Sequence, residues 1–152
     1  MKNRWGTVIE ISRVDWISEV TESSKTCWVI VHLYNDSVAH CDLVNESILS
    51  LAPRFPALKF VKIRSTQAVE NWPDKNLPTL FIYNQGELKH QLLTLNSLRG
   101  DSFTTQDLEW WLSTKNILET ELEGPPEQAK SKFNVSSKAL ASSIYDDDED
   151  EI

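Results

Sequence analysis

Cysteine, glycine and basic residues are all scarce in this chain. Its 152 residues include two cysteines and four glycines, and 15 Lys and Arg are outnumbered by 23 Asp and Glu. Two cysteines are too few for a disulfide framework, and the scattered glycines form no phosphate-binding loop. The net charge of −8 excludes the strongly basic surface that nucleic acid or an anionic membrane attracts.

Long apolar runs are absent too. No stretch reaches the roughly 20 apolar residues that a membrane span needs, and Met1-Lys2-Asn3-Arg4 is not followed by the apolar core of a signal peptide. We therefore expect a soluble chain in the cytoplasm, where cysteines stay reduced. His32, His40 and His90 have no spacing typical of a closed metal site, so no metal or other cofactor is expected.

The acidity is concentrated at the C-terminal end. Asp146 to Glu151 are six consecutive acids, which leaves −2 for the rest of the chain. After Leu122 the apolar content falls, and Gly124-Pro125-Pro126 breaks regular structure. Such a composition cannot bury enough apolar area to offset the entropy of ordering. We predict one domain over residues 1–122 and a disordered acidic tail over residues 123–152.

The most informative segment runs from Cys27 to Ala52. Trp28 to Tyr34 is an apolar, β-branched run typical of a strand buried on both faces. Asn35-Asp36-Ser37 follows with side chains able to cap a helix. The helix itself is predicted by apolar residues at spacings of three and four, which are Val38, Cys41, Val44, Ile48 and Leu51. Pro53 and Pro56 are expected to stop it.

The other elements complete an α/β pattern. Strands are predicted at 7–11, 59–63, 79–83 and 87–93, with a turn at Asn84-Gln85-Gly86 between the last two. A helix after Ser12 is expected to bury Val14, Ile17 and Val20, and a last helix follows Thr104 or Thr105. The first strands are parallel and the last two form a hairpin, so we predict a mixed central sheet flanked by helices.

Chemistry in such sheets is usually located at the carboxyl ends of the strands. A dithiol oxidoreductase needs an attacking and a resolving thiol at the start of the following helix. Only Cys41 of Val38-Ala39-His40-Cys41 is a thiol. Cys41 is either a reactive thiol assisted by the helix start and His40, or a buried core cysteine of the apolar series, which we favour.

This turn resembles the redox turn of thioredoxin with its first cysteine replaced by Val38. The buried acid of thioredoxins falls on His32, the tryptophan before the redox pair falls on Ser37, and Leu77-Pro78-Thr79 resembles the segment with the cis-proline. We therefore expect Pro78 to be cis. Three stretches together resemble the phosducin-like proteins, in the branch of phosducin-like protein 2 and 3 (viral IAP-associated factor); they are Trp28 to Tyr34, Asn71 to Thr79 and Asp107 to Trp110.

The resemblance implies a thioredoxin-like fold and a non-catalytic binding module. Phosducin-like proteins of this branch are cytosolic co-chaperones that assist the chaperonin CCT/TRiC in folding actin and tubulin, and they modulate apoptosis. Gβγ binding belongs more to phosducin itself and uses an N-terminal helical region, which we expect this chain, starting at Met1, to lack. We expect a monomer that binds protein partners, with no nucleic acid and no membrane.

Two points remain open from the sequence. The alternative function is a thioredoxin-type oxidoreductase that uses Cys41 alone. Trp72, in a polar loop, is either half-buried or an interface anchor. The candidate partner contacts are the polar or aromatic loop residues that the thioredoxin frame places beside the turn; they are Asn35, Asp36, Ser37, Trp72, Asp74 and Lys75.

Overall fold

The computed structural model describes residues 4–126. The predicted disordered tail therefore lies outside the described residues except for its first four. Contacts within the chain divide it into two units, residues 1–109 and residues 110–152. The domain boundary at residue 122 stays a prediction.

The first unit is built on a five-stranded sheet in the order β1-β3-β2-β4-β5. Its strands are β1 (Val8–Glu10), β2 (Val29–Tyr34), β3 (Lys59–Arg64), β4 (Thr79–Asn84) and β5 (Glu87–Leu93). β3 pairs in parallel with β1 and β2, whereas β4 pairs antiparallel with β2 and β5. The predicted mixed sheet is thus confirmed, with the fully buried β2 at its centre.

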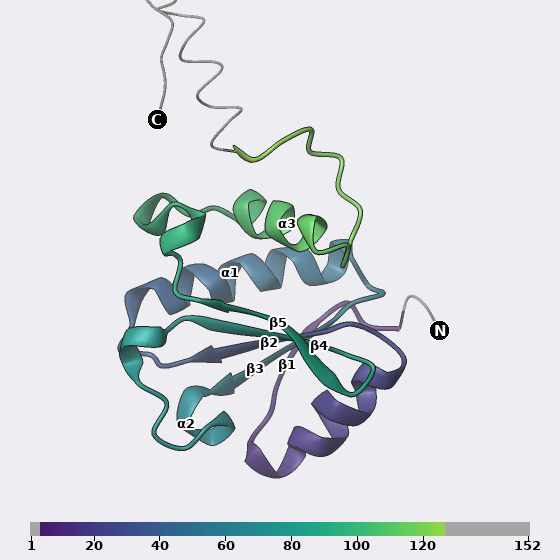
Figure 1. Ribbon diagram of the computed structural model, residues 1–152, viewed down its shortest axis with the longest axis vertical. Helices are drawn as coiled ribbons and strands as arrows, with labels where there is room; N and C mark the ends of the chain where they lie inside the picture. The colour runs from purple at the N-terminus through teal and green to yellow at the C-terminus, as the bar shows by residue number, and fades with distance from the viewer. Residues whose placement is uncertain (1–3, 127–152) are drawn as a thin grey trace, which may run out of the picture. The chain divides into compact units, whose positions relative to one another are not determined.

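Helices lie on both faces of the sheet (Figure 1). Helix α1 (Ala39–Arg54) covers one face, and the helical segments η1 (Arg13–Asp15), η2 (Ile17–Glu22) and η3 (Ser23–Lys25) lie on the other with the short α2 (Ser65–Ala68). α1 continues one residue past Pro53 and ends at Arg54, so its end falls between Pro53 and Pro56. A proline fits helical φ, and so close to the helix end it removes only one backbone hydrogen bond.

The predicted apolar face of the helix after Ser12 is wrong. Val20 is fully buried, but Val14 is 86% exposed and Ile17 is 63% exposed. Val14 lies in the 3-10 segment η1, and Ile17 begins η2, which is a π-helix. Its hydrogen bonds reach one residue further than in an α-helix, so residues spaced by three and four no longer share one face.

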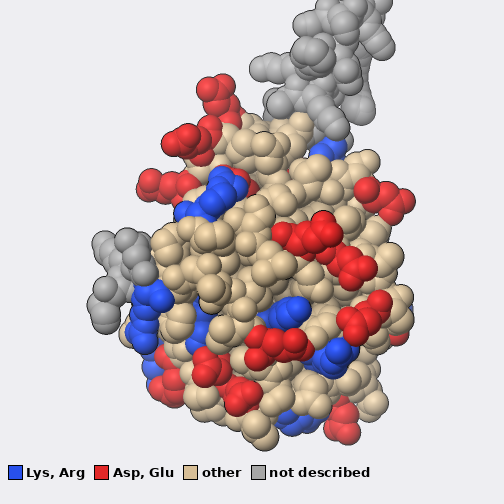
Figure 2. Space-filling view, turned by 180° about the vertical axis from the view of Figure 1, so that it is seen from behind, with Lys and Arg blue, Asp and Glu red and all other residues tan. Residues whose placement is uncertain are grey.

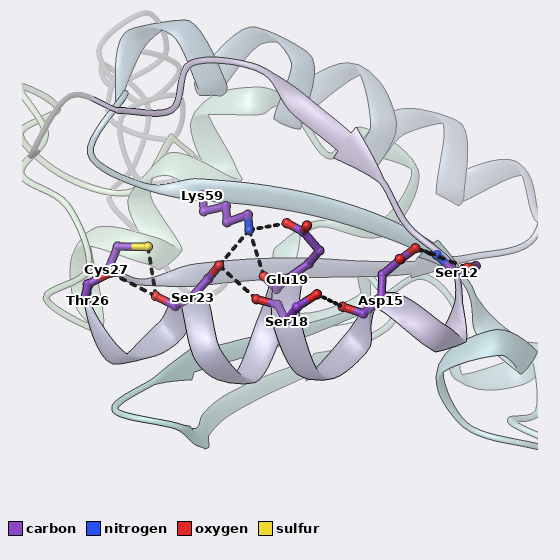
Figure 3. Close-up of polar contacts among 8 residues, drawn as sticks. All are labelled: Ser12, Asp15, Ser18, Glu19, Ser23, Thr26, Cys27 and Lys59. Carbon is purple, nitrogen blue, oxygen red and sulfur yellow. Dashed lines mark hydrogen bonds and ion pairs between the residues drawn. The ribbon is translucent and has the colours of Figure 1, made fainter.

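A buried lysine holds η2 in place (Figure 3). Lys59, the first residue of β3, is 2% exposed. Its Nζ donates to the Glu19 carbonyl oxygen at 3.0 Å, to Glu19 Oε1 at 2.6 Å and to Ser23 Oγ at 2.8 Å. The Trp5 ring lies 4.6 Å from the same ammonium. All the hydrogen-bonding capacity of this cation is therefore used inside the fold.

Helix α3 (Thr105–Thr114) crosses the boundary between the units. In the first unit, Thr105 Oγ1 donates to Ser47 Oγ of α1 at 3.2 Å, and Arg54 pairs with Glu109 at 3.0 Å. In the second unit, the Lys115 ammonium lies 5.5 Å from the Trp111 ring, and Ile117 N donates to the Leu112 carbonyl oxygen at 3.1 Å. No helix among residues 4–126 combines the length and apolar character that crossing a membrane requires.

Candidate functional site

The Val38–Cys41 turn lies where the sequence predicted it, between the carboxyl end of β2 and the first turn of α1. Val38 is the N-cap residue of α1 in an extended conformation, without a side-chain cap. Asn35 does not cap the helix, contrary to our expectation. Its Oδ1 instead accepts from the backbone nitrogen and the hydroxyl of Ser37, at 3.0 and 3.1 Å, which stabilises the loop before the helix.

Cys41 is part of the apolar core and is 0% exposed. Burial raises the pKa of its thiol, and the carboxylates of Asp42, Asp74 and Asp36 raise it further, while a hydrogen bond involving the Asn35 backbone opposes the rise. A raised pKa keeps the sulfur protonated at neutral pH, and the thiol is a poor nucleophile. The position of the attacking thiol is occupied by Val38, so this turn holds one buried thiol.

Cys27, the other cysteine, is half-buried near the opposite end of the sheet. Its Sγ donates to the Ser23 carbonyl oxygen at 3.4 Å. Burial raises the pKa of this thiol too, against the opposing influence of Trp5, Lys59 and Arg4. Both cysteines are free, and among the described residues no group of three or more His, Cys, Asp or Glu side chains is placed to hold a metal ion.

The loop containing Pro78 lies beside the turn. Leu77–Pro78 is a cis peptide bond, and the short helical segment η4 (Asp74–Asn76) precedes it. Asn35 Nδ2 donates to Asp74 Oδ1 at 3.3 Å. Two segments that are 39 residues apart in the sequence are thereby joined into one surface.

The Trp72 side chain packs against the core of the domain. Its ring is half-buried and meets Phe81 edge-on, with the ring centroids 5.7 Å apart. Its Nε1 donates to Thr79 Oγ1 at 3.1 Å. This geometry favours the half-buried alternative, whereas Lys75 on the same loop is exposed.

Two further residues contact this region and were missed from the sequence. Arg64, at the end of β3, pairs with Asp36 at 3.2 Å. Asp101 Oδ1 lies 2.6 Å from His40 Nε2. Arg64 was predictable, because parallel β2 and β3 end at the same edge of the sheet. Asp101 had no local signal, because 61 residues separate it from His40.

The loop that carries Asp101 is held by a buried ion pair. Arg99, at a positive φ of 75°, donates from Nε and Nη2 to the Asp107 carboxylate, each at 3.1 Å. The same carboxylate caps α3 by accepting from Thr104 N at 2.7 Å. Asp101 itself is 96% exposed at its side chain. The Val38–Cys41 turn is therefore bordered by Asp74 and Asp101, and the loop that carries Asp101 is held in place by the Arg99–Asp107 pair.

Comparisons with known proteins agree with this geometry. The phosducin family model matches residues 1–139. This chain belongs to the phosducin family. It is 39% identical over 137 residues to phosducin-like protein 3 of Mus musculus, covering 90% of this chain and 57% of that protein. It is 39% identical over 145 residues to phosducin-like protein 2 of Drosophila melanogaster, covering 95% and 60%.

The chain thus spans about three fifths of the length of these relatives. Among solved structures, it is similar to thioredoxin F from spinach chloroplast, with a TM-score of 0.56 and 11% identity, over 76% of this chain and 90% of that one. At that identity the likeness concerns the fold alone. The predictions of a thioredoxin-like fold and of phosducin-like relationship are both confirmed.

Proposed function

We propose that this domain is a non-catalytic protein-binding module that acts as a co-chaperone of the chaperonin CCT/TRiC in the cytoplasm, assisting the folding of actin and tubulin. Membership in the phosducin family supports a role in binding proteins. The observation that carries the non-catalytic part is the turn itself, in which Val38 occupies the place of the attacking thiol and Cys41 is 0% exposed. A role in modulating apoptosis belongs to the same proposal.

The proposed contact surface is the "turn surface", defined as Asn35, Asp36, Ser37, Asp74, Lys75 and Asp101. Three of its six residues are carboxylates and one, Lys75, is a cation. Arg64 pairs with Asp36, and His40 lies 2.6 Å from Asp101. On the face shown in Figure 2, acidic and basic side chains are interspersed. Exposed charges of one sign increase the association rate with a partner of opposite sign and make binding sensitive to salt.

Binding is tested by pull-down of purified CCT with Asp36→Asn/Asp74→Asn, compared with Glu22→Gln/Glu87→Gln. Both double variants remove two negative charges, but Glu22 ends η2 and Glu87 begins β5, at the opposite end of the sheet. We expect the first to weaken binding about 3- to 10-fold and the second to leave it unchanged. Equal effects would remove the turn surface from the proposal, and no binding by the wild-type chain at low salt would refute the co-chaperone role of this domain.

Catalysis is tested by insulin reduction with dithiothreitol, with thioredoxin as the positive control. Because the thiol is buried and protonated, we expect no turnover above background for the wild-type chain or for Cys41→Ser. A thiol titration of the native protein should find Cys41 protected until the fold is opened. Turnover by wild type that disappears in Cys41→Ser would establish the single-cysteine oxidoreductase instead.

A further inference from the structure

His32 is a buried histidine at the centre of the sheet. It is 0% exposed, and its ladder neighbours are Lys62 of β3 and Leu80 of β4. Its Nδ1 lies 3.0 Å from Asn45 Oδ1 of α1, so a proton on Nδ1 completes a hydrogen bond from β2 to α1. The other ring nitrogen, Nε2, is buried without a hydrogen-bond partner among residues 4–126. The site therefore suits a neutral imidazole.

The charges around His32 do not suit a cation. From β3, the Lys62 ammonium lies 5.3 Å from the Tyr34 ring, and that ring is 5.8 Å from the imidazole. From β1, the Glu10 carboxylate accepts a hydrogen bond from the Tyr34 hydroxyl. β4 contributes the apolar Leu80. The Glu10 carboxylate is thus already engaged by Tyr34, and Lys62, the ladder neighbour of His32, disfavours a second positive charge there.

From α1, the contacting group is the neutral amide of Asn45, because the acids beside it in sequence, Asp42 and Glu46, are exposed. A proton added to Nε2 would create a buried N–H donor without an acceptor, which is costly in a low-dielectric layer. The pKa of His32 is lowered from 6.5 to about 3 by burial, with a contribution from Lys62 in the same direction and against the hydrogen bond with Asn45.

We propose that His32 is an acid-sensitive latch between β2 and α1, which holds α1 on the sheet only while the imidazole is neutral. In the unfolded chain the imidazole takes up a proton once the pH falls below its ordinary pKa of 6.5. In the folded chain the His32 imidazole takes up that proton only at a far lower pH. The stabilisation is therefore complete above about pH 6.5 and is lost progressively as the pH falls towards 3.

The latch has a consequence for the turn surface, because α1 carries both. Asn45 lies one helical turn beyond Cys41 on α1 (Ala39–Arg54). Loss of the His32–Asn45 contact removes one tie between β2 and the helix that begins directly after Val38. We therefore expect acidification to affect the turn surface through His32, without protonation of the turn-surface residues themselves.

The wild-type chain allows a direct test. An NMR titration of the imidazole 13C and 15N shifts should find His32 neutral in the folded protein down to pH 4. His40 and His90, which are half-exposed, provide reference signals in the same spectra. A folded-state His32 that takes up its proton above pH 5 would overturn the proposal, and no variant is needed for this measurement.

Urea unfolding at pH 7 and pH 5 provides the second test. From an unfolded value of 6.5 and a folded value of about 3, the unfolding constant should rise about 25-fold more for wild type than for His32→Leu over this interval. His90→Gln is the control and should respond as wild type does. Equal responses of wild type and His32→Leu would refute the latch.

Asn45→Asp tests whether the sensor is the contact with α1. A carboxylate opposite Nδ1 favours the imidazolium, so the excess response to pH should shrink from about 25-fold to below about 5-fold. An undiminished response in Asn45→Asp would show that α1 does not take part, and the latch as proposed would be wrong. A response that shrinks only in this variant and in His32→Leu supports it.

Discussion

Strand β3 begins and ends with a basic residue, and the two residues are used in opposite ways. Lys59 has a side chain that is 2% exposed, and its ammonium donates to three acceptors. Arg64 has a side chain that is 54% exposed and pairs with one carboxylate, that of Asp36, which is itself 72% exposed. The comparison separates a charge that the fold requires from charges that remain available to a partner.

The largest expected effect is at the buried end of this comparison. Lys59→Met keeps most of the side-chain volume but removes the donor of the Glu19 carbonyl oxygen, the Glu19 carboxylate and Ser23 Oγ. Loss of one partner from a buried polar cluster leaves the others unsatisfied, so we expect the free energy of unfolding to fall by about 3 kcal/mol. Urea unfolding followed by circular dichroism measures this.

The same variant tests the π-helix. If Lys59 fixes the register of η2, the segment around Val14 and Ile17 should become more susceptible to proteolysis in Lys59→Met than in wild type. A free energy of unfolding within about 1 kcal/mol of wild type would mean that the ammonium contributes little, and the contrast with Arg64 would disappear.

An intermediate effect is expected at Trp72, which lies on the turn side but is tied to the core. Trp72→Phe keeps an aromatic ring against Phe81 and removes the hydrogen bond to Thr79, which should cost about 1 kcal/mol. Thr79→Val removes the other partner. A double-mutant cycle of the two substitutions should give a coupling of similar size; a coupling near zero would return Trp72 to the candidates for partner contact.

The fold was predictable because its central elements are locally consistent. The apolar run before Asn35 has no polar face, so it predicts a strand buried on both faces, and β2 is that strand. The series from Cys41 to Leu51 has helical spacing, and the buried side of α1 follows it. In both cases the pattern within a few residues agrees with the tertiary environment.

Where tertiary contacts override the local pattern, prediction from the sequence failed. Lys59 alternates with apolar residues like a surface lysine, yet acceptors from η2 and η3, about 40 residues earlier, bury it. The same contacts accompany the π-helix that begins at the exposed Ile17. At the turn surface, Asn35 and Asp74 were found through a family frame, whereas Asp101 depends on a loop whose position no nearby residue indicates.

The smallest effect on stability is expected at the exposed end of β3. Arg64→Met removes a surface ion pair with Asp36, and such pairs contribute little because both partners remain hydrated and mobile. We expect the free energy of unfolding to change by less than about 0.5 kcal/mol, measured under the same conditions as for Lys59→Met.

The effect of Arg64→Met on binding should nevertheless be measurable, in the direction opposite to that of Asp36→Asn/Asp74→Asn. Without the guanidinium, the carboxylate of Asp36 is no longer neutralised, and the turn surface becomes more negative. If that surface binds a basic partner, affinity for CCT should rise about 2-fold at low salt and the difference should vanish at high salt, because added ions screen exposed charges. A fall in affinity would mean that Arg64 itself contacts the partner, and unchanged affinity at all salt concentrations would place the contact on another face of the domain.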